Sequence, residues 1–488
     1  MTALSSHTRH SRTYQRAWAK ALSKPAREFG STPLPVLSGA VPAGLRGTLY
    51  RNGPGRLERG GSPVGHWFDG DGAILAVHFT DDGATGVYRY VKTAGYVAES
   101  AANEFLYGNY GTKPPLPIWQ YWLNLLTHTE TLKNTANTSV LALPDKLLAL
   151  WEAGNPHALD LQTLDTLGVD SLGALEAQQP YSAHPRQDPL TGEIFNIGID
   201  PQSQMHLYRS DRYGTIQNKG KIKLDDIALL HSFALAGRYL IFFIPPMRLN
   251  LLPLLFGYKS YSEAIEWQPQ QATQILVVDR ETFEVVSRGE AEPWFQWHFG
   301  NGSVEPDGTV VLDFVRFADF DHTNEWLRQV ATGQAHTLSV GTLCQVRLNP
   351  QTGKIIELQP VVDRPCEFPV VSPQQVGQPW RHTYLALHRA EEVDVAQELF
   401  GAIARFDYET ETLTEADFGK NRYPTEPIYV ADPANPDRGW VLAVVYDGNT
   451  NQSEVWIFDS DRLNEEPLCR LGLPEVIPMG FHGIWRSA

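Results

Sequence analysis

The stretch ILVVDRETFEVV, residues 275–286, carries the pattern that decides the fold. A short apolar strand runs up to Asp279, a turn follows, and a second strand begins. Asp, Asn and Ser suit this turn position because their side chains can bond the backbone of a tight turn. The stretch therefore predicts a β-hairpin centred on Asp279.

Five further stretches repeat this pattern. They are ALDLQTLDTLG at 158–168, HLYRSDRYGTI at 206–216, CQVRLNPQTGKII at 344–356, IARFDYETETL at 403–413 and VWIFDSDRLNE at 455–465, with turn residues Asp160, Ser210, Asn349, Asp407 and Asp459. Successive turns lie roughly 50 to 70 residues apart, near the length of a four-stranded propeller blade. Each stretch tends to follow other β-branched or aromatic runs bounded by Gly, Pro, Asp and Asn.

The repeats predict an all-β fold, a seven-bladed β-propeller formed by one domain over residues 1–488. Its first blade has to combine residues near 46–96 with strands from the C-terminus, and residues 1–40 precede it as an extension. A pair of β-sandwiches is the alternative, and the regular spacing favours the propeller. Amphipathic helices are scarce, and residues 23–30 and the Trp119 region are the modest candidates.

The charge balance excludes one class of partner. The chain has 40 Lys and Arg against 56 Asp and Glu, a net charge of −16, whereas nucleic-acid binding needs clustered positive charge. The three cysteines are too few for a disulfide framework, which predicts a reducing, cytoplasmic setting.

Two segments are unusually apolar, 114–126 (PPLPIWQYWLNLL) and 240–258 (LIFFIPPMRLNLLPLLFGY). Prolines and polar residues interrupt both, and no uninterrupted apolar run reaches the length of about 18 residues that a spanning helix needs. The segments are either buried or form an apolar patch that touches a membrane surface.

Four of the 15 histidines stand among apolar or small residues. They are His184 in YSAHPR, His231 in LLHSF, His298 in FQWHFGN and His482 in GFHGIW. No local pair has a zinc-type spacing, so a metal site must assemble from remote positions. A propeller permits this because the inner strands of its blades face a common axis.

Motifs along nearly the whole chain resemble the carotenoid cleavage oxygenases, and are similar to the cyanobacterial apocarotenoid-cleaving members. The matching segments are GTLYRNGPG at 47–55, WFDGDG at 67–72, ANT at 136–138, LLALWEAG at 147–154, SAHPR at 182–186, HSF at 231–233, HFGN at 298–301, CEFPVV at 366–371, TEPIYV at 425–430 and FHG at 481–483. The family fold is a seven-bladed propeller with a loop dome over one end. Residues of about 100–135 and 240–265 are expected in that dome.

The resemblance implies a site of four histidines and three glutamates. His184, His231, His298 and His482 are expected to bind Fe(II), and the glutamates to accept hydrogen bonds from three of the imidazoles; they are Glu152, Glu367 and Glu426. Carboxylates in that position fix the tautomer and orientation of a metal-binding ring. An unpaired glutamate among such apolar neighbours would be costly to bury.

Three positions depart from the family pattern without touching a proposed ligand. Ser232 stands where Asp is common, Phe299 where a second His is frequent, and Thr425 where Gly is common.

The resemblance further implies an enzyme, a dioxygenase that uses O2 to split a double bond of a carotenoid or apocarotenoid into aldehydes. Such a substrate needs an apolar tunnel, and aromatic residues near the proposed ligands are candidates to line it: Phe68, Trp151, Phe233, Trp297 and Phe368. Central cleavage of an apocarotenal to retinal is favoured over cleavage of a full-length carotenoid nearer its ring. A stilbene-cleaving oxygenase, a non-oxidative isomerase and a metal-free kelch-type propeller are the alternatives. The apolar segments would then let the enzyme lie peripherally on a membrane to extract its substrate.

Overall fold

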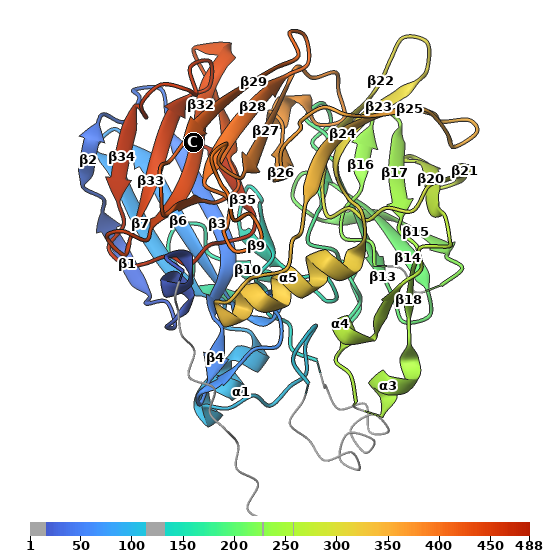
Figure 1. The fold of residues 1–488 in the computed structure, drawn as a ribbon, viewed down its shortest axis with the longest axis horizontal. Coiled ribbons are helices and arrows are strands. Elements are labelled where there is room, and N and C mark those ends of the chain that lie inside the picture. The colour runs from blue at the N-terminus through green and yellow to red at the C-terminus, as the bar shows by residue number, and fades with distance from the viewer. Residues whose placement is uncertain (1–15, 114–131, 227–228, 257) are drawn as a thin grey trace, which may run out of the picture.

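Seven antiparallel sheets radiate from one axis in the computed structural model, which describes residues 16–113, 132–226, 229–256 and 258–488 (Figure 1). We number the sheets as blades 1 to 7. Blade 1 contains β1 (Phe29–Pro33), β3 (Gly47–Arg56), β6 (Asp71–Thr80), β7 (Gly83–Tyr90) and β35 (Gly483–Ser487). Blade 2 contains β8 (Ser139–Ala142), β9 (Leu147–Leu150), β10 (His157–Leu159) and β11 (Thr166–Val169). Blade 3 contains β12 (Arg186–Gln187), β13 (Ile194–Ile199), β14 (Gln204–Ser210) and β15 (Ile216–Lys223).

The remaining blades follow in chain order. Blade 4 contains β16 (Ala234–Ala236), β17 (Tyr239–Ile244), β20 (Thr273–Asp279) and β21 (Val285–Ala291). Blade 5 contains β22 (Phe299–Val304), β23 (Val310–Phe317), β24 (Gly341–Asn349) and β25 (Lys354–Pro360). Blade 6 contains β26 (Cys366–Val370), β27 (His382–Leu387), β28 (Ala402–Asp407) and β29 (Thr412–Asp417). Blade 7 contains β2 (Val36–Gly39), β30 (Arg422–Pro424), β31 (Ile428–Asp432), β32 (Asn435–Asp447), β33 (Gln452–Asp459) and β34 (Cys469–Gly472).

Strands from the two ends of the chain close the ring. The C-terminal strand β35 pairs with β3 from Gly47↔Ser487 to Arg51↔Gly483. In blade 7 the N-terminal strand β2 pairs with β34. The prediction that blade 1 combines N-terminal and C-terminal strands is therefore confirmed.

The predicted turn residues act as expected at five of the six repeats. Asp160, Asp279, Asn349, Asp407 and Asp459 each accept a hydrogen bond from the backbone N–H two residues later, at 2.8–2.9 Å. The assignment of Ser210 is wrong, because Asp211 accepts the N–H of Tyr213 instead. Ser210 ends β14 and is buried, so its hydroxyl is not available to the turn.

Large side chains fill the spaces between neighbouring blades. Phe195 of blade 3 and Phe242 of blade 4 belong to one buried cluster, and Phe243 and Phe314 join blades 4 and 5 in the next. Burying a side chain of this size contributes about 1.5–3 kcal/mol. Face-to-face packing of this kind holds the inner strands around the axis.

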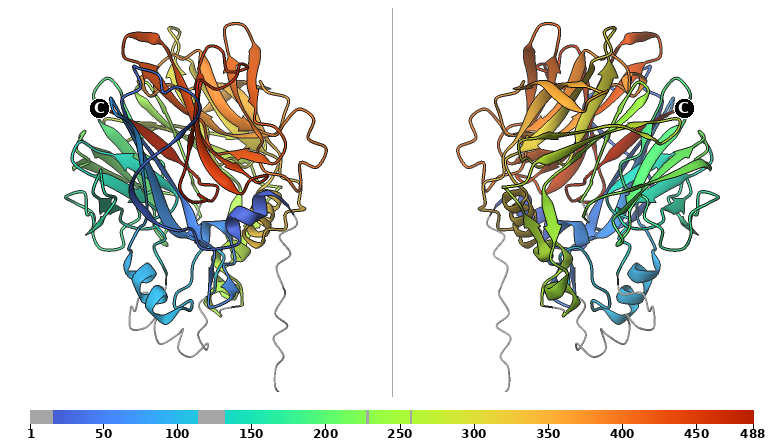
Figure 2. Two further views of the ribbon diagram at one scale, coloured as in Figure 1. Left: turned by 90° about the vertical axis from the view of Figure 1, so that its left-hand side faces the viewer. Right: turned by 90° about the vertical axis from the view of Figure 1, so that its right-hand side faces the viewer.

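Helices and short hairpins gather at one end of the propeller (Figure 2). They are α1 (Ala94–Ala102), α3 (Leu251–Leu255), α4 (Tyr261–Ala264), α5 (Phe320–Thr332), the 3₁₀ turns η1 (Trp18–Leu22) and η2 (Trp67–Asp69), and the strand pairs β4 (Glu58–Arg59) with β5 (Ser62–Pro63) and β18 (Met247–Leu249) with β19 (Ile265–Trp267). The 3₁₀ turn η3 (Pro373–Gln375) lies instead beside the turn between β16 and β17, where Gly377 pairs with Ala236. Of the two apolar segments, 240–258 divides between the buried strand β17 and this end, and 114–126 falls outside the described residues. None of the described helices is long and apolar enough to cross a bilayer.

The helix predictions were less accurate than the strand predictions. A helix over residues 23–30 is wrong, because η1 ends at Leu22 and the backbone is extended by Phe29. The Trp119 region lies outside the described residues. The longest described helix, α5, was not predicted, although Asp319 caps it by accepting the N–H of His322 and Gly333 ends it in a left-handed conformation.

Candidate metal centre

Four blades each deliver one histidine at the same point of the fold. His231, His298 and His482 precede the innermost strands β16, β22 and β35 of blades 4, 5 and 1, and His184 lies two residues before β12 of blade 3. Innermost strands converge on the axis, so side chains at their starts meet there. One ring nitrogen from each histidine lies within 4.8 Å of those of the other three.

The remaining three blades each deliver one glutamate to the same centre. Glu152 follows β9 of blade 2, Glu367 lies in β26 of blade 6, and Glu426 connects β30 and β31 of blade 7. Glu367 Oε2 lies 2.6 Å from His298 Nδ1, and Glu426 Oε1 lies 2.9 Å from His482 Nδ1. Glu152 Oε1 lies 3.1 Å from His231 Nδ1 and 3.6 Å from His184 Nε2.

Glu426 is held as a buried anion. Arg51 donates from Nη1 to Glu426 Oε2 at 2.9 Å and from Nη2 to its backbone carbonyl at 3.1 Å, and the Gly483 N–H donates to Oε2 at 2.8 Å. Burial alone would raise the pKa of Glu426, but His482 and Arg51 outweigh it and the pKa lies below its ordinary value. Burial also lowers the pKa of Arg51 to about 10, which leaves it charged at neutral pH.

Glu367 has no such cation beside it. Its partners are the His298 imidazole and the N–H of Phe368, and its Oε1 has no hydrogen-bond partner among the described residues. Burial raises the pKa of Glu367 to about 8. Phe368 has a φ of 58°, unusual for a residue other than glycine, where the pairing of β26 with β27 shifts register. This bulge brings Glu367 to His298 and places the Phe368 ring over the His298 ring, with centroids 5.5 Å apart.

The donor set fits a metal ion. Because the Nδ1 atoms of His231 and His298 face carboxylates, their Nε2 atoms carry lone pairs, and these two atoms lie 3.2 Å apart. His184 Nε2 is buried and has no hydrogen-bond partner among the described residues. Burial and the neighbouring imidazoles lower the pKa of His184 and that of His298 well below the ordinary value, which favours neutral rings. Converging lone pairs and a buried, unpaired nitrogen are what a cation would satisfy.

Arg186 supports the centre from the side of blade 3. Its guanidinium donates to the carbonyls of Phe233 at 3.0 Å and Phe299 at 2.7 Å, and to Ser232 Oγ at 3.2 Å. These contacts tie the segment that carries His184 to blades 4 and 5. Arg186 is partly buried and has no ion pair within 4.0 Å with a described carboxylate.

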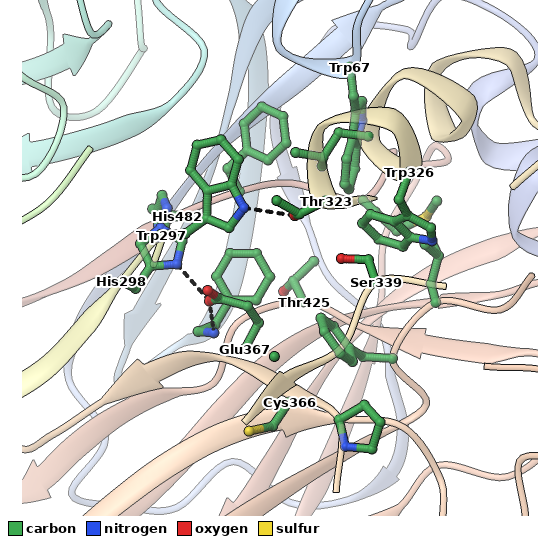
Figure 3. A pocket seen from close by; sticks show the side chains of 18 of the residues that line it. Trp67, Trp297, His298, Thr323, Trp326, Ser339, Cys366, Glu367, Thr425 and His482 are labelled. Atoms are coloured by element: carbon green, nitrogen blue, oxygen red, sulfur yellow. Dashed lines mark hydrogen bonds and ion pairs between the residues drawn. The ribbon is translucent and has the colours of Figure 1, made fainter. Parts of the chain in front are cut away.

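Two cavities meet at His231. One, of about 1220 Å³, opens on the Glu152 side toward α3 and α4, and the other, of about 100 Å³, lies on the Glu367 side under α5 (Figure 3). Phe68, Thr138, His231 and Trp297 line both cavities. His231 therefore stands between the two spaces, and His298 and His482 line the smaller one.

The aromatic residues proposed for a tunnel divide into two groups. Phe68 and Trp297 line both cavities, Trp151 lines the larger and Phe368 the smaller. Phe233 lines neither; it is fully buried and stacks on Phe242 in the blade core. Further lining residues were not predicted. Trp67 stands in the WFDGDG motif, whereas the others carry no diagnostic motif: Tyr110, Trp326, His388 and Phe400.

Comparisons with known proteins agree with this architecture. Residues 23–487 match the family described as retinal pigment epithelial membrane protein. Apocarotenoid-15,15′-oxygenase from Synechocystis sp. is 35% identical over 472 residues, 92% of this chain and 92% of the relative. Carotenoid 9,10(9′,10′)-cleavage dioxygenase 1 from Arabidopsis thaliana is 28% identical over 93% of this chain and 86% of the relative. The crystal structure of cobalt-substituted Synechocystis ACO superposes with a TM-score of 0.88 at 32% identity, covering 98% of this chain and 99% of that chain. The chain belongs to the retinal pigment epithelial membrane protein family, the family of the carotenoid cleavage oxygenases.

Proposed function

We propose that this protein is a non-haem Fe(II) dioxygenase that cleaves a carbon–carbon double bond of a carotenoid or apocarotenoid to aldehyde products. The observation that carries the proposal is the four-histidine cluster, in which His231 lines two largely apolar cavities and His298 and His482 line the smaller one. A rod-shaped substrate lying through both cavities would bring an internal bond to the histidines and leave its ends on either side. The similarity to apocarotenoid-15,15′-oxygenase supports the same chemistry.

In this proposal His184, His231, His298 and His482 hold the metal through neutral imidazoles. Four imidazole ligands suit iron, copper or zinc alike, and the oxygenase names of the relatives favour iron. Fe(II) supplies the activation of dioxygen beside the polyene. Glu367 and Glu426 orient the rings of His298 and His482 through their Nδ1 atoms, and Glu152 does so for His231.

The aromatic residues have two roles. Phe68 lies parallel to the His231 ring at 6.3 Å, and Trp297 meets the same ring edge-on at 4.9 Å. Thr323 Oγ1 accepts the Trp297 Nε1–H at 2.9 Å and so fixes the indole. These rings position a flat conjugated chain and exclude water from the bond that reacts.

A phenol-binding site would need a lysine that can meet the phenol. Lys133 contacts Asp71 and Glu99, and Lys113 donates to the Tyr258 carbonyl at 2.7 Å. Lys259 also lines the larger cavity, so a stilbene stays the alternative substrate. Central cleavage of an apocarotenal remains the favoured reaction, because 35% identity joins this chain to a 15,15′-oxygenase and 28% to a 9,10 dioxygenase.

The mouth of the larger cavity supports peripheral membrane binding. Leu251, Leu252, Phe256 and Tyr258 are exposed there, with Leu252 66% and Tyr258 71% exposed, and Leu251 and Phe256 also line the cavity. Apolar side chains around an entrance would enter one leaflet and admit a lipid-dissolved substrate. Trp119 and Trp122, expected in the same patch, lie outside the described residues. The three described cysteines are free and buried, which supports a reducing, cytoplasmic compartment.

The experiment that tests the function starts with protein purified without oxygen and loaded with Fe(II). β-Apo-8′-carotenal in detergent should lose its polyene absorbance only when O2 is admitted, and product masses identify the bond. His298→Ala should abolish both metal binding and turnover. His322→Ala is the matched control, since this histidine is exposed on α5 and should leave turnover unchanged.

Two outcomes would contradict the proposal. Failure of the wild-type protein to bind Fe(II) would remove the four-histidine site. Turnover of resveratrol but of no polyene by the iron-loaded protein would reassign the substrate.

A further inference from the structure

Three buried polar atoms without partners line the smaller cavity. Thr425 Oγ1, His388 Nδ1 and Glu367 Oε1 have no hydrogen-bond partner among the described residues, and all three residues line this cavity. Thr425 and His388 are each only 5% exposed. A buried polar atom left unpaired costs about 1–3 kcal/mol, so such atoms are uncommon without a purpose.

The polar atoms stand in an otherwise apolar wall. Trp67, Phe317, Trp326, Leu399, Phe400 and Met479 form most of the remaining surface of the cavity. Figure 3 shows the hydroxyls of Thr425 and Ser339 between Glu367 near the histidines and Trp326 at the far side. A valine would fill the place of Thr425 with the same shape and no unpaired atom. The hydroxyl is therefore a chemical feature of the cavity and not a requirement of packing.

The backbone holds Thr425 in place. Its N–H donates to the Val444 carbonyl at 2.9 Å, and it directly precedes Glu426, which Arg51 and His482 fix. Ser339, in the connection from α5 to β24, is partly exposed and faces the same cavity. A fixed hydroxyl and a second one on a connecting segment can meet a ligand oxygen from two sides.

We propose that Thr425, together with Ser339 and His388, binds an oxygen atom on the end of the polyene that lies in the smaller cavity. This inference rests on the proposed function and deepens it, because it names the residues that bind the oxygenated end of the polyene and the cavity that holds this end. A threonine or serine hydroxyl can donate to a carbonyl oxygen and can also accept from a hydroxyl group. Burial lowers the pKa of His388 to about 4, so its ring is neutral and adds no charge to the cavity. The site therefore suits an uncharged aldehyde, ketone or alcohol.

The test varies one oxygen on a constant carbon skeleton. β-Apo-8′-carotenal, its alcohol and the hydrocarbon with a terminal methyl group are compared, each with and without a hydroxyl on the ring, so that either end of the molecule is probed. Affinities are measured on the iron-loaded protein without O2, and kcat/KM with O2. The wild type should prefer an oxygenated end by about tenfold, the value of one net hydrogen bond.

Variants assign that preference to Thr425. Thr425→Val keeps the shape and should reduce the preference to about twofold or less, whereas Thr425→Ser keeps the hydroxyl and should retain it. Ser339→Ala should reduce the preference by a smaller factor, and it serves as the second test if Thr425→Val does not fold. The aldehyde should also absorb at longer wavelength when bound to wild type than to Thr425→Val, because a hydrogen bond to its carbonyl polarises the polyene.

Outcomes separate this inference from the proposed function. An unchanged preference in Thr425→Val and in Ser339→Ala, with cleavage intact, would overturn the role of these residues and leave the oxygenase proposal standing. Binding that depends on Thr425 without cleavage of any polyene would support the binding site and overturn the proposed reaction.

Discussion

Replacing Glu426 by glutamine should destabilise the metal-free protein, whereas the same replacement at Glu367 should not. The Glu426 carboxylate faces Arg51, whose side chain is only 2% exposed, and the pair is buried. Glutamine would leave the Arg51 charge buried without an anion, which costs about 3–5 kcal/mol. Glu367 has no cationic partner, and its Oε2 faces the His298 Nδ1 and accepts the Phe368 N–H, so an amide there leaves no buried cation without an anion.

The expected change in melting temperature follows from the size of the protein. Unfolding of 488 residues carries an entropy of about 1.0 kcal/mol/K, taken at roughly 2.1 cal/mol/K per residue. A loss of about 3–5 kcal/mol therefore lowers the melting temperature of Glu426→Gln by about 3–5 °C, and Glu367→Gln should stay within about 1 °C of wild type. Calorimetry of the metal-free proteins at pH 7 measures both.

Metal binding should respond differently from stability. Both variants weaken the orientation of one imidazole, so Fe(II) affinity should fall by about 10- to 100-fold in each. If Glu367→Gln lowered the melting temperature of the metal-free protein as much as Glu426→Gln, the assignment of a buried ion pair to Glu426 alone would be refuted.

Further predictions concern other parts of the molecule. Burial raises the pKa of Asp69 from 3.8 to about 6, so its contribution to stability is present below pH 3.8 and is lost as the pH rises through 6. The stability of wild type relative to Asp69→Asn should therefore fall by about 2.4 kcal/mol between pH 4 and 7 in urea titrations, and a constant difference would contradict this. Ser232→Asp should raise the melting temperature by about 1–3 °C, because the new carboxylate would pair with the Arg186 guanidinium that now contacts Ser232 Oγ. A lower melting temperature would show that the space around Ser232 is too small for aspartate. Leu252→Ser should reduce the fraction of protein that sediments with liposomes several-fold. Leu190→Ser, on the exposed turn between β12 and β13, should leave this fraction unchanged. Equal liposome binding of the two variants would show that Leu252 does not take part in membrane binding.

The hairpins of the blades could be predicted from sequence because each turn depends on residues within the same hairpin. Asp279 and Asn349 stand at turns where their side chains accept backbone N–H groups, and local hydrogen bonds of this kind depend on few distant residues. The same local reasoning failed at Ser210, where the next residue, Asp211, offers a stronger acceptor. Adjacent polar residues compete for one turn, and only the register of the strand decides between them.

The histidines and glutamates could be named from motifs, but their arrangement could not. That each of the seven blades supplies one side chain to the centre depends on how the blades close around the axis. Arg51 illustrates the limit, because it lies 375 residues from Glu426 in sequence and nothing local predicts the contact. Helix α5 was not predicted although its signals are local, since Asp319 caps its first turn and Gly333 ends it.

The order in which the chain is synthesised gives the closure of the ring a further consequence. His482 is the last of the four histidines, and it directly precedes β35, the strand that completes blade 1 by pairing with β3. At about 5–20 residues per second, synthesis of a chain this long takes about 25–100 s, and through nearly all of it at most three of the four histidines exist. An emerging chain therefore holds neither a closed ring nor a full set of ligands. Metal loading therefore becomes a step that follows synthesis of β35, and a chain stopped short of this strand would be recognisable by its inability to retain a metal ion.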